Sequence, residues 1–189
     1  MTTAAAPVRR QAPPKPAADL NLLIAHYRDS VEEFIARAEA VDVARWEQPR
    51  AEGKWTPAQE AEHVGLAFEV ITRDLEGQQG FRLVLHGWKR LVIRFIFLPR
   101  ILAGSFPVAA RAPREVRPAV PTKSRAELLN QLRTNAEKAL NLAVDVVARE
   151  PGRTCVHPYF GSLTVREMLV FASVHTLHHA DFLPAARQT

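Results

Sequence analysis

The sequence predicts an all-α protein: an antiparallel four-helix bundle with an additional basic helix and a proline-rich crossover. Four segments repeat apolar residues at intervals of three and four, which is the period of an amphipathic helix. Helix-capping patterns begin at Thr56, Ser124 and Thr164, and no segment shows the alternation of a half-buried strand. Because each apolar stripe must be buried against another, we expect the four helices to form one bundle.

Length and composition indicate one domain over residues 19–184. With 189 residues, 47% of them hydrophobic and 24% charged, the chain can bury an ordinary globular core. Residues 1–18 are rich in proline and alanine and lack the apolar stretch of a signal peptide, so we expect a disordered arm there and a short tail at 185–189. Cys155 is the only cysteine, which excludes an internal disulfide and predicts a reducing, cytoplasmic location.

The first two helices are predicted on either side of a loop at 46–55. Apolar residues repeat with a helical period from Asp19 to Val41, so a helix should end before Pro49. The second helix should begin at Pro57, after the Thr56 cap, and run to about Glu76, where two glycines stop it.

Residues 81–104 predict a basic amphipathic helix broken by Pro99. Between 82 and 125 the chain has ten basic residues and one acid, Glu115. These charges interrupt the apolar run, so it is not a conventional transmembrane helix. The next segment, 105–123, contains four prolines and predicts an extended connection across the surface.

Two further helices complete the predicted bundle. Ser124 and Glu127 form a capping-box pattern for a helix that ends near Glu150. Thr164 and Glu167 repeat the pattern for a last helix, from 165 to about 183, that is closed by Pro184.

The last helix places His175 and His179 on its apolar stripe, about one turn apart, with His178 at the edge of that stripe. One interpretation is that the pair grips a metal ion. The other is that both are core or boundary histidines bonded to backbone or carboxylate groups. Thr176 stands where a zinc protease of the H-E-x-x-H type has its glutamate, so that mechanism is excluded.

His63 is the candidate for a third ligand, two turns into the second helix. It lies at the boundary of that helix's apolar stripe, and periodicity leaves its role undecided. Three neutral imidazoles with open coordination positions suit zinc, nickel or iron and can activate a water or a thiol. His26, His86 and His157 show no such spacing, and Cys155 is expected to be a small buried hydrophobe.

Three segments of the chain resemble the DinB/YfiT-like superfamily of metal-binding four-helix bundles. KWTPAQEAEHVGLAFEVI at 54–71 is similar to the family's second helix, and HPYFGSLTVREMLVFASVHTLHHADF at 157–182 to its final loop and helix. APREVRPAVPTKSRAELLNQL at 112–132 is similar to the connection in one branch of the family. The resemblance covers roughly residues 20–183.

The resemblance implies an up-down-down-up bundle, often a homodimer, with a divalent metal held by three histidines. The ligands then fall on His63, His175 and His179. Characterised relatives include metal-dependent transferases of low-molecular-weight thiols such as bacillithiol, and mycothiol-dependent isomerases. Phe182 departs from the family, which often has a glutamine there, and this places thiol chemistry in doubt while leaving the ligands intact.

We therefore expect a three-histidine divalent-metal protein, either a thiol transferase or a hydrolase acting on a small molecule. His178 is either a proton-transfer group beside the metal or an exposed structural residue. Trp55, Tyr159 and Phe160 either wall a substrate pocket or serve packing alone.

The alternative function is a non-catalytic binding module with a structural or vestigial metal. Its basic helix at 82–100 would dock on a membrane surface or a protein partner. The competing expectation is that the apolar face of this helix, which includes Trp88 and Phe95, covers the bundle. Nucleic-acid binding is disfavoured, since the bases are confined to one segment without a recognised motif.

Overall fold

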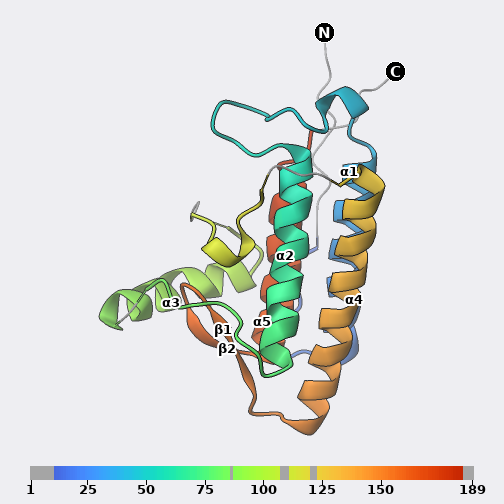
Figure 1. Cartoon of the computed structure of the whole chain (residues 1–189). Coiled ribbons are helices and arrows are strands. Elements are labelled where there is room, and N and C mark those ends of the chain that lie inside the picture. The colour runs from blue at the N-terminus through green and yellow to red at the C-terminus, as the bar shows by residue number, and fades with distance from the viewer. Residues whose placement is uncertain (1–10, 86, 107–110, 120–122, 185–189) are drawn as a thin grey trace.

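The computed structural model describes residues 11–85, 87–106, 111–119 and 123–184. The helices of this part are α1 (Leu20–Glu39), α2 (Pro57–Leu75), α3 (Gly87–Leu102), α4 (Arg125–Arg149) and α5 (Val165–Ala180), shown in Figure 1. Two short strands, β1 (Thr154–His157) and β2 (Gly161–Thr164), and two 3₁₀ turns, η1 (Val43–Arg45) and η2 (Arg114–Val116), complete the described elements. The prediction of an all-α, four-helix bundle with an additional helix is confirmed.

The predicted capping patterns set where three of the four bundle helices begin. Thr56, Ser124 and Thr164 each accept a hydrogen bond from the backbone N–H three residues on, and the side chain at that third position bonds back to the cap. These capping boxes satisfy N–H groups that the first turn would otherwise leave without partners. They explain why the starts of α2, α4 and α5 agree with the sequence prediction.

Two ion pairs show that α1 and α4 are antiparallel. Arg28 Nε lies 3.1 Å from Glu137 Oε1, and further along α1 Glu32 Oε1 lies 3.3 Å from Nε of the earlier residue Arg133. Helices α1 and α5 are parallel, since Arg37 near the end of α1 pairs with Asp181 just after α5, at 3.0 Å.

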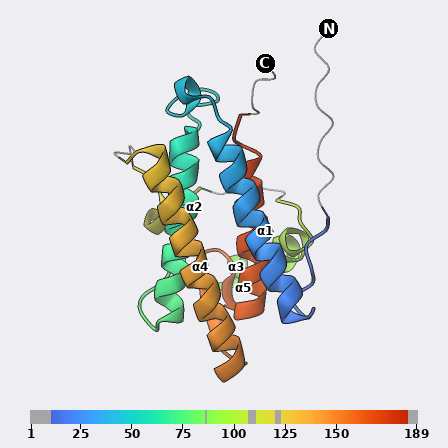
Figure 2. The same ribbon diagram turned by 90° about the vertical axis from the view of Figure 1, so that its right-hand side faces the viewer.

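Helices α2 and α4 are parallel neighbours, as Figures 1 and 2 show. Asn135 Nδ2 donates to the carbonyl of Gly65 over 3.2 Å, and Lys138 pairs with Glu76 over 2.7 Å. Gly65 permits this close approach, because a Cβ there would already lie 3.7 Å from Leu132 Cα. The chain order is therefore up, down, down, up, and the long segment 76–124 returns the chain from the end of α2 to the start of α4.

The core lies between these four helices. Its largest fully buried side chains include Tyr27, Phe34, Phe68, Leu132 and Leu140. The Tyr27 ring lies 5.5 Å from that of Phe68, and its hydroxyl donates to the Ala136 carbonyl over 3.0 Å. Each buried aromatic side chain contributes about 1.5–3 kcal/mol through the area it removes from water.

The prediction that the chain has no strand is wrong. Residues 154–164 form an antiparallel hairpin in which Thr154 pairs with Thr164 and His157 with Gly161. Gly161 adopts a φ of 75°, in the left-handed region that favours glycine. The Asp74 carboxylate at the end of α2 accepts a hydrogen bond of 2.6 Å from Val156 N and ties the hairpin to the bundle. Four residues per strand are too few for an alternating pattern to stand out in the sequence.

Helix α3 lies beside the bundle, and two expectations about it are wrong. Pro99 does not break the helix, because it sits in the last turns of α3. The carbonyl four residues earlier, at Phe95, loses its N–H partner, but this position is exposed, so solvent can bond it. The apolar face does not cover the bundle either: Leu98 and Ile101 are buried, whereas Trp88, Leu91 and Phe95 are exposed.

The predicted extended connection 105–123 contains the turn η2, whose Val116 is buried against α2. Residues 107–110 and 120–122 of this connection lie outside the described residues.

The predicted disordered arm and tail fall mostly outside the described residues, at 1–10 and 185–189. At the end of the arm, Arg166 on α5 donates to the carbonyls of Pro16 and Ala18 over 3.4 and 2.8 Å. Among the described helices, none combines the length and the apolar character needed to cross a bilayer.

Candidate metal centre

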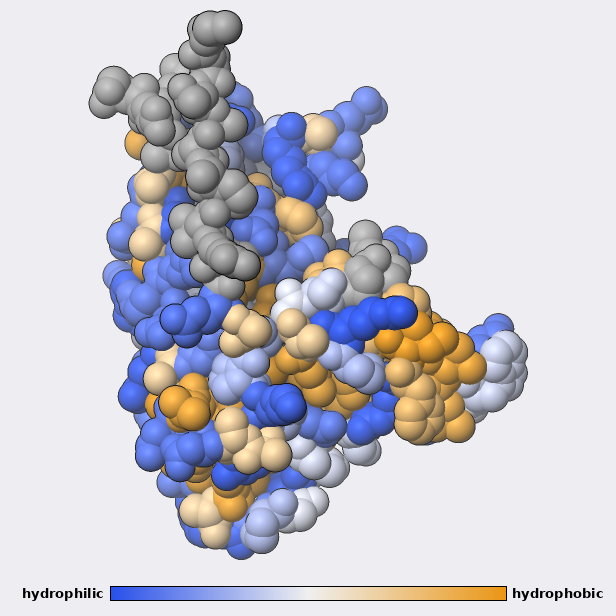
Figure 3. Space-filling view, turned by 180° about the vertical axis from the view of Figure 1, so that it is seen from behind, coloured by the Kyte–Doolittle hydropathy of each residue, from blue (hydrophilic) through white to orange (hydrophobic). Residues whose placement is uncertain are grey.

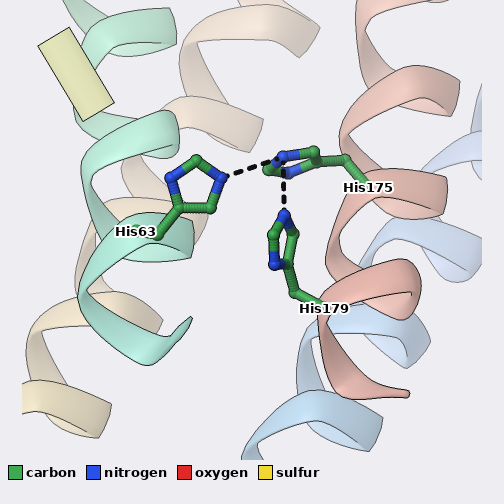
Figure 4. Close-up of side chains that lie close together, drawn as sticks. All are labelled: His63, His175 and His179. Carbon is green, nitrogen blue, oxygen red and sulfur yellow. Dashed lines mark hydrogen bonds between the residues drawn. The ribbon is translucent and has the colours of Figure 1, made fainter. Parts of the chain in front are cut away.

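Two neighbouring helices bring three histidines together. His63 lies on α2, and His175 and His179 lie one turn apart on α5, which runs antiparallel to α2. The three rings point toward one another across the space between these helices (Figure 4). Within the described residues, this is a group of histidine, cysteine or acidic side chains that could hold a metal ion, with its ligand atoms within 4.8 Å of one another.

The Nε2 atom of His175 lies close to the Nε2 atoms of both other histidines. His175 Nε2 lies 3.2 Å from His63 Nε2 and 3.1 Å from His179 Nε2. A zinc ion about 2.0–2.1 Å from each nitrogen would separate tetrahedral ligands by about 3.3 Å. The two distances to His175 Nε2 are therefore close to those between nitrogens that share one ion, and all three ligand atoms lie within 4.8 Å of one another.

Two of the rings are held by hydrogen bonds at the opposite nitrogen. His63 Nδ1 lies 2.7 Å from the Val116 carbonyl oxygen, and His179 Nδ1 lies 2.7 Å from Glu60 Oε2. A carbonyl can only accept, so His63 Nδ1 carries the proton and its Nε2 presents a lone pair. Metal-binding histidines in proteins are held by this kind of contact.

Neutral imidazole rings cannot satisfy the hydrogen-bonding needs of all three Nε2 atoms by bonding to one another. A single ring nitrogen either donates or accepts, yet His175 Nε2 contacts two other Nε2 atoms. His175 could accept from both only if His63 were doubly protonated, and burial lowers the pKa of His63 to about 4. A cation between the three nitrogens would satisfy all three lone pairs, so the residues present fit a divalent metal.

Burial sets the protonation of the group. Desolvation lowers the pKa values of His175 and His179 well below the usual value, and the neighbouring rings lower them further. Burial also raises the pKa of Glu60 to about 7, an effect that the charge of Arg50 opposes. The imidazoles are thus neutral near pH 7, as metal ligands must be.

Aromatic side chains surround the three histidines. The ring of Trp55 lies 4.8 Å from that of His63, beside the three histidines. Phe171 stacks on His175 at 5.8 Å, and Phe182 meets His179 edge-on at 5.6 Å. His175 is the partly exposed member of the three, so the site opens to solvent on its side.

The other predicted pocket residues lie further out. Phe160 contacts Phe171 and stacks on His157 rather than on the three histidines. The Tyr159 hydroxyl donates to the Arg111 carbonyl, away from the site. The structure thus places Trp55, but not Tyr159 or Phe160, directly beside the three histidines.

His178 lies beside the three histidines. Its ring stacks on Phe106 at 4.4 Å and lies 5.5 Å from the His179 ring. The guanidinium of Arg50 sits 4.0 Å above the Phe182 ring, at the same end of α5. The charge of Arg50 and the imidazole of His178 therefore lie at the border of the site.

Sequence reasoning missed Glu60, Val116, Phe106 and Arg50 as neighbours of the site. For Glu60 a signal was present, since an acid three residues before His63 on a largely apolar helix face lies on the same side as the histidine. The others come from irregular segments whose approach to α2 and α5 has no periodic pattern.

Comparison with known proteins decides the family. The family model described as the DinB superfamily matches residues 26–183, which is most of the chain. The chain belongs to the DinB superfamily. No curated protein and no solved structure matches it. As a DinB-superfamily member it combines an all-α fold with a buried histidine group able to hold a metal.

Proposed function

We propose that this DinB-superfamily protein binds a divalent zinc, nickel or iron ion through His63, His175 and His179. The short distances from His175 Nε2 to the other two Nε2 atoms, with the Nδ1 atoms of His63 and His179 bonded elsewhere, carry this proposal. Neutral imidazole nitrogens are good ligands for these ions, whereas calcium and magnesium prefer oxygen.

We further propose that the protein acts on a small molecule as a thiol transferase or a hydrolase. A divalent ion bound here supplies Lewis acidity that lowers the pKa of a thiol or a water. Three protein ligands leave coordination positions free, and the partly exposed His175 marks the side from which a substrate would reach them.

The chain's own groups have distinct parts in this proposal. Val116 and Glu60 hold the His63 and His179 rings in place, and Trp55 and Phe182 exclude water. His178 is positioned to accept the proton released by a thiol or water. Burial lowers the pKa of His178, so it is neutral near pH 7 and free to accept.

Arg50 favours a substrate with a negative charge on the side of Phe182. The Phe182 ring holds the Arg50 guanidinium in place, and this charge acts on His178 and His179 nearby. A carboxylate on the substrate would complete a bidentate pair there.

Metal content tests the site. The protein is purified without a histidine tag and its metal is measured by mass spectrometry, beside His175→Ala and the control His26→Ala, which changes a half-buried histidine on α1. We expect one metal per chain in the native protein and the control, and only traces in His175→Ala. Equal trace metal in all three proteins would contradict the proposal.

Turnover is tested separately, with the metal-loaded protein, a low-molecular-weight thiol and an electrophilic aromatic halide. Thioether formation above that with His175→Ala supports the transferase, in which the sulfur forms a bond to carbon, halide leaves with its electron pair and the thiol proton passes to solvent. Full metal occupancy without turnover of this pair or of simple esters favours a non-catalytic module with a structural metal.

The packing of Phe182 on His178 and His179 is the observation that favours this second candidate.

A further inference from the structure

Helix α3 exposes a continuous apolar face. Of the eight exposed large hydrophobic side chains among the described residues, six lie between 84 and 96: Val84, Trp88, Leu91, Val92, Phe95 and Ile96. Trp88 and Phe95 are 70% and 73% exposed. Figure 3 shows this face as a hydrophobic patch on the part of the molecule that projects from the bundle. The positions 88, 91, 92 and 95 follow the helical period, so one side of α3 is apolar and faces water.

The opposite side of α3 is fixed to the bundle. Arg94 donates to the carbonyls of Phe160 and Ser162 over 3.1 and 2.6 Å, and Leu98 and Ile101 are buried against the core. The apolar face therefore cannot turn inward without breaking these contacts. An exposed apolar patch of this extent on an anchored helix is typical of an interaction surface.

The charge around this face has one sign. No acidic residue lies between Glu76 and Glu115, while Lys89 and Arg100 are exposed beside the apolar stripe. These two bases are about three helical turns apart and so lie along the same flank. Arg90 and Arg94 are turned instead toward the hairpin, where Arg90 approaches Gly161 and Arg94 bonds to the backbone.

We propose that α3 docks this chain on a membrane surface that contains anionic lipids. The side chains of Trp88, Leu91 and Phe95 would enter the interface between headgroups and acyl chains, with Lys89 and Arg100 against the lipid phosphates. The helix would lie in the plane of the surface, because it spans 16 residues and is not apolar enough to cross a bilayer.

A lipid surface fits this face better than a second copy of the chain does. Two copies joined through α3 would bring Lys89 and Arg100 of each near those of the other, with no acidic residue on the helix to offset them. An anionic surface complements the same charges at every position along the helix.

Vesicle binding by the full chain tests the proposal. The protein is mixed with vesicles of phosphatidylcholine alone and with vesicles that also contain phosphatidylglycerol, and the sedimented fraction is measured. We expect binding to the anionic vesicles, a marked decrease at high salt, and a blue shift of tryptophan emission as Trp88 leaves water. Trp88 is the most exposed of the three tryptophans, since Trp46 is buried and Trp55 half-buried, and Trp88→Phe should remove the shift.

Matched variants locate the contact. Phe95→Glu should abolish binding, and Val43→Glu, which makes the same change at an exposed position on η1, should leave it intact. Lys89→Gln with Arg100→Gln should weaken binding to anionic vesicles about 30-fold, which corresponds to about fivefold for each charge removed. Arg94 is left unchanged, because its substitution would release α3 from the bundle.

Two outcomes would overturn the proposal. One is the absence of sedimentation with anionic vesicles, or equal sedimentation of native protein and Phe95→Glu. The other is a native dimer that Phe95→Glu converts to a monomer while vesicles bind neither form, which would assign the face to a second copy. Sedimentation velocity measures the oligomeric state. A dimer that persists in Phe95→Glu forms through a surface other than α3, and it agrees with the homodimer implied by the family.

Discussion

Glu60 and His179 form a buried contact of 2.7 Å between Oε2 and Nδ1 that joins the first turns of α2 to the last turn of α5. The contact turns His179 Nε2 toward the other two histidines. A carboxylate in this position makes the imidazole a stronger electron donor and fixes its orientation.

Glu60→Gln should weaken metal binding about 10- to 100-fold while the fold is retained. The amide oxygen can still accept from His179 Nδ1, so the loss reflects the missing negative charge. Affinity is measured by competition with a chelator of known strength. Glu69→Gln, at a half-buried position on the same helix, should leave the affinity unchanged. An equal loss in both variants would show that helix stability rather than Glu60 is responsible.

Cys155 should be inert in the folded protein. It is buried in β1, and burial raises the pKa of its thiol to about 12, so a negligible fraction is thiolate at pH 8. We expect no reaction with a disulfide reagent in the native state and one thiol per chain in denaturant. Fast reaction of the native protein would show that β1 opens or that the thiol is activated.

Tyr27→Phe should lower the free energy of unfolding by about 1 kcal/mol, the usual loss for one buried hydrogen bond. The ring and its packing on Phe68 are kept, and only the bond to the Ala136 carbonyl is removed. Urea unfolding measures the difference. Metal content should not change, since Tyr27 makes no contact with the three histidines.

The bundle was predictable because its signals are local. Thr56, Ser124 and Thr164 mark helix starts through hydrogen bonds to residues only three positions away. The period of the apolar residues indicates which face of each helix is buried. The hairpin at 154–164 was missed because its strands are short and its stability comes partly from Asp74 on another element. The outward direction of α3 was missed for a related reason. The same apolar pattern is expected for a helix face that packs on a core and for one that is exposed to solvent.

The candidate site was predictable in part. The pair His175 and His179 follows from helical spacing, whereas His63 stood at the boundary of its stripe and was assigned through the family resemblance. The structure places His63 in the buried group. Its Nδ1 contact to Val116 spans 53 residues, and the Glu60 contact to His179 spans 119, so no local pattern indicates either.

His157 should make the protein less stable as the pH falls. It is buried between Phe160 and Phe171, and desolvation lowers its pKa from 6.5 to about 3. The unfolded chain therefore binds a proton below pH 6.5 that the folded chain does not. Stability is fully present above pH 6.5 and falls by up to about 1.4 kcal/mol per pH unit until the folded pKa is reached.

His157→Gln should flatten this dependence. Glutamine does not titrate, and its carbonyl oxygen can replace His157 Nδ1 as the acceptor for the N–H groups of Tyr159 and Phe160, which lie 3.3 Å away. Urea unfolding of chelator-treated native protein and variant from pH 7 to about pH 4 measures the slopes, and the difference between them isolates His157 from the three site histidines. His26→Gln, at a half-buried position, should change the slope less. Parallel slopes for the native protein and His157→Gln would mean that water reaches His157 and that its pKa is near the ordinary value.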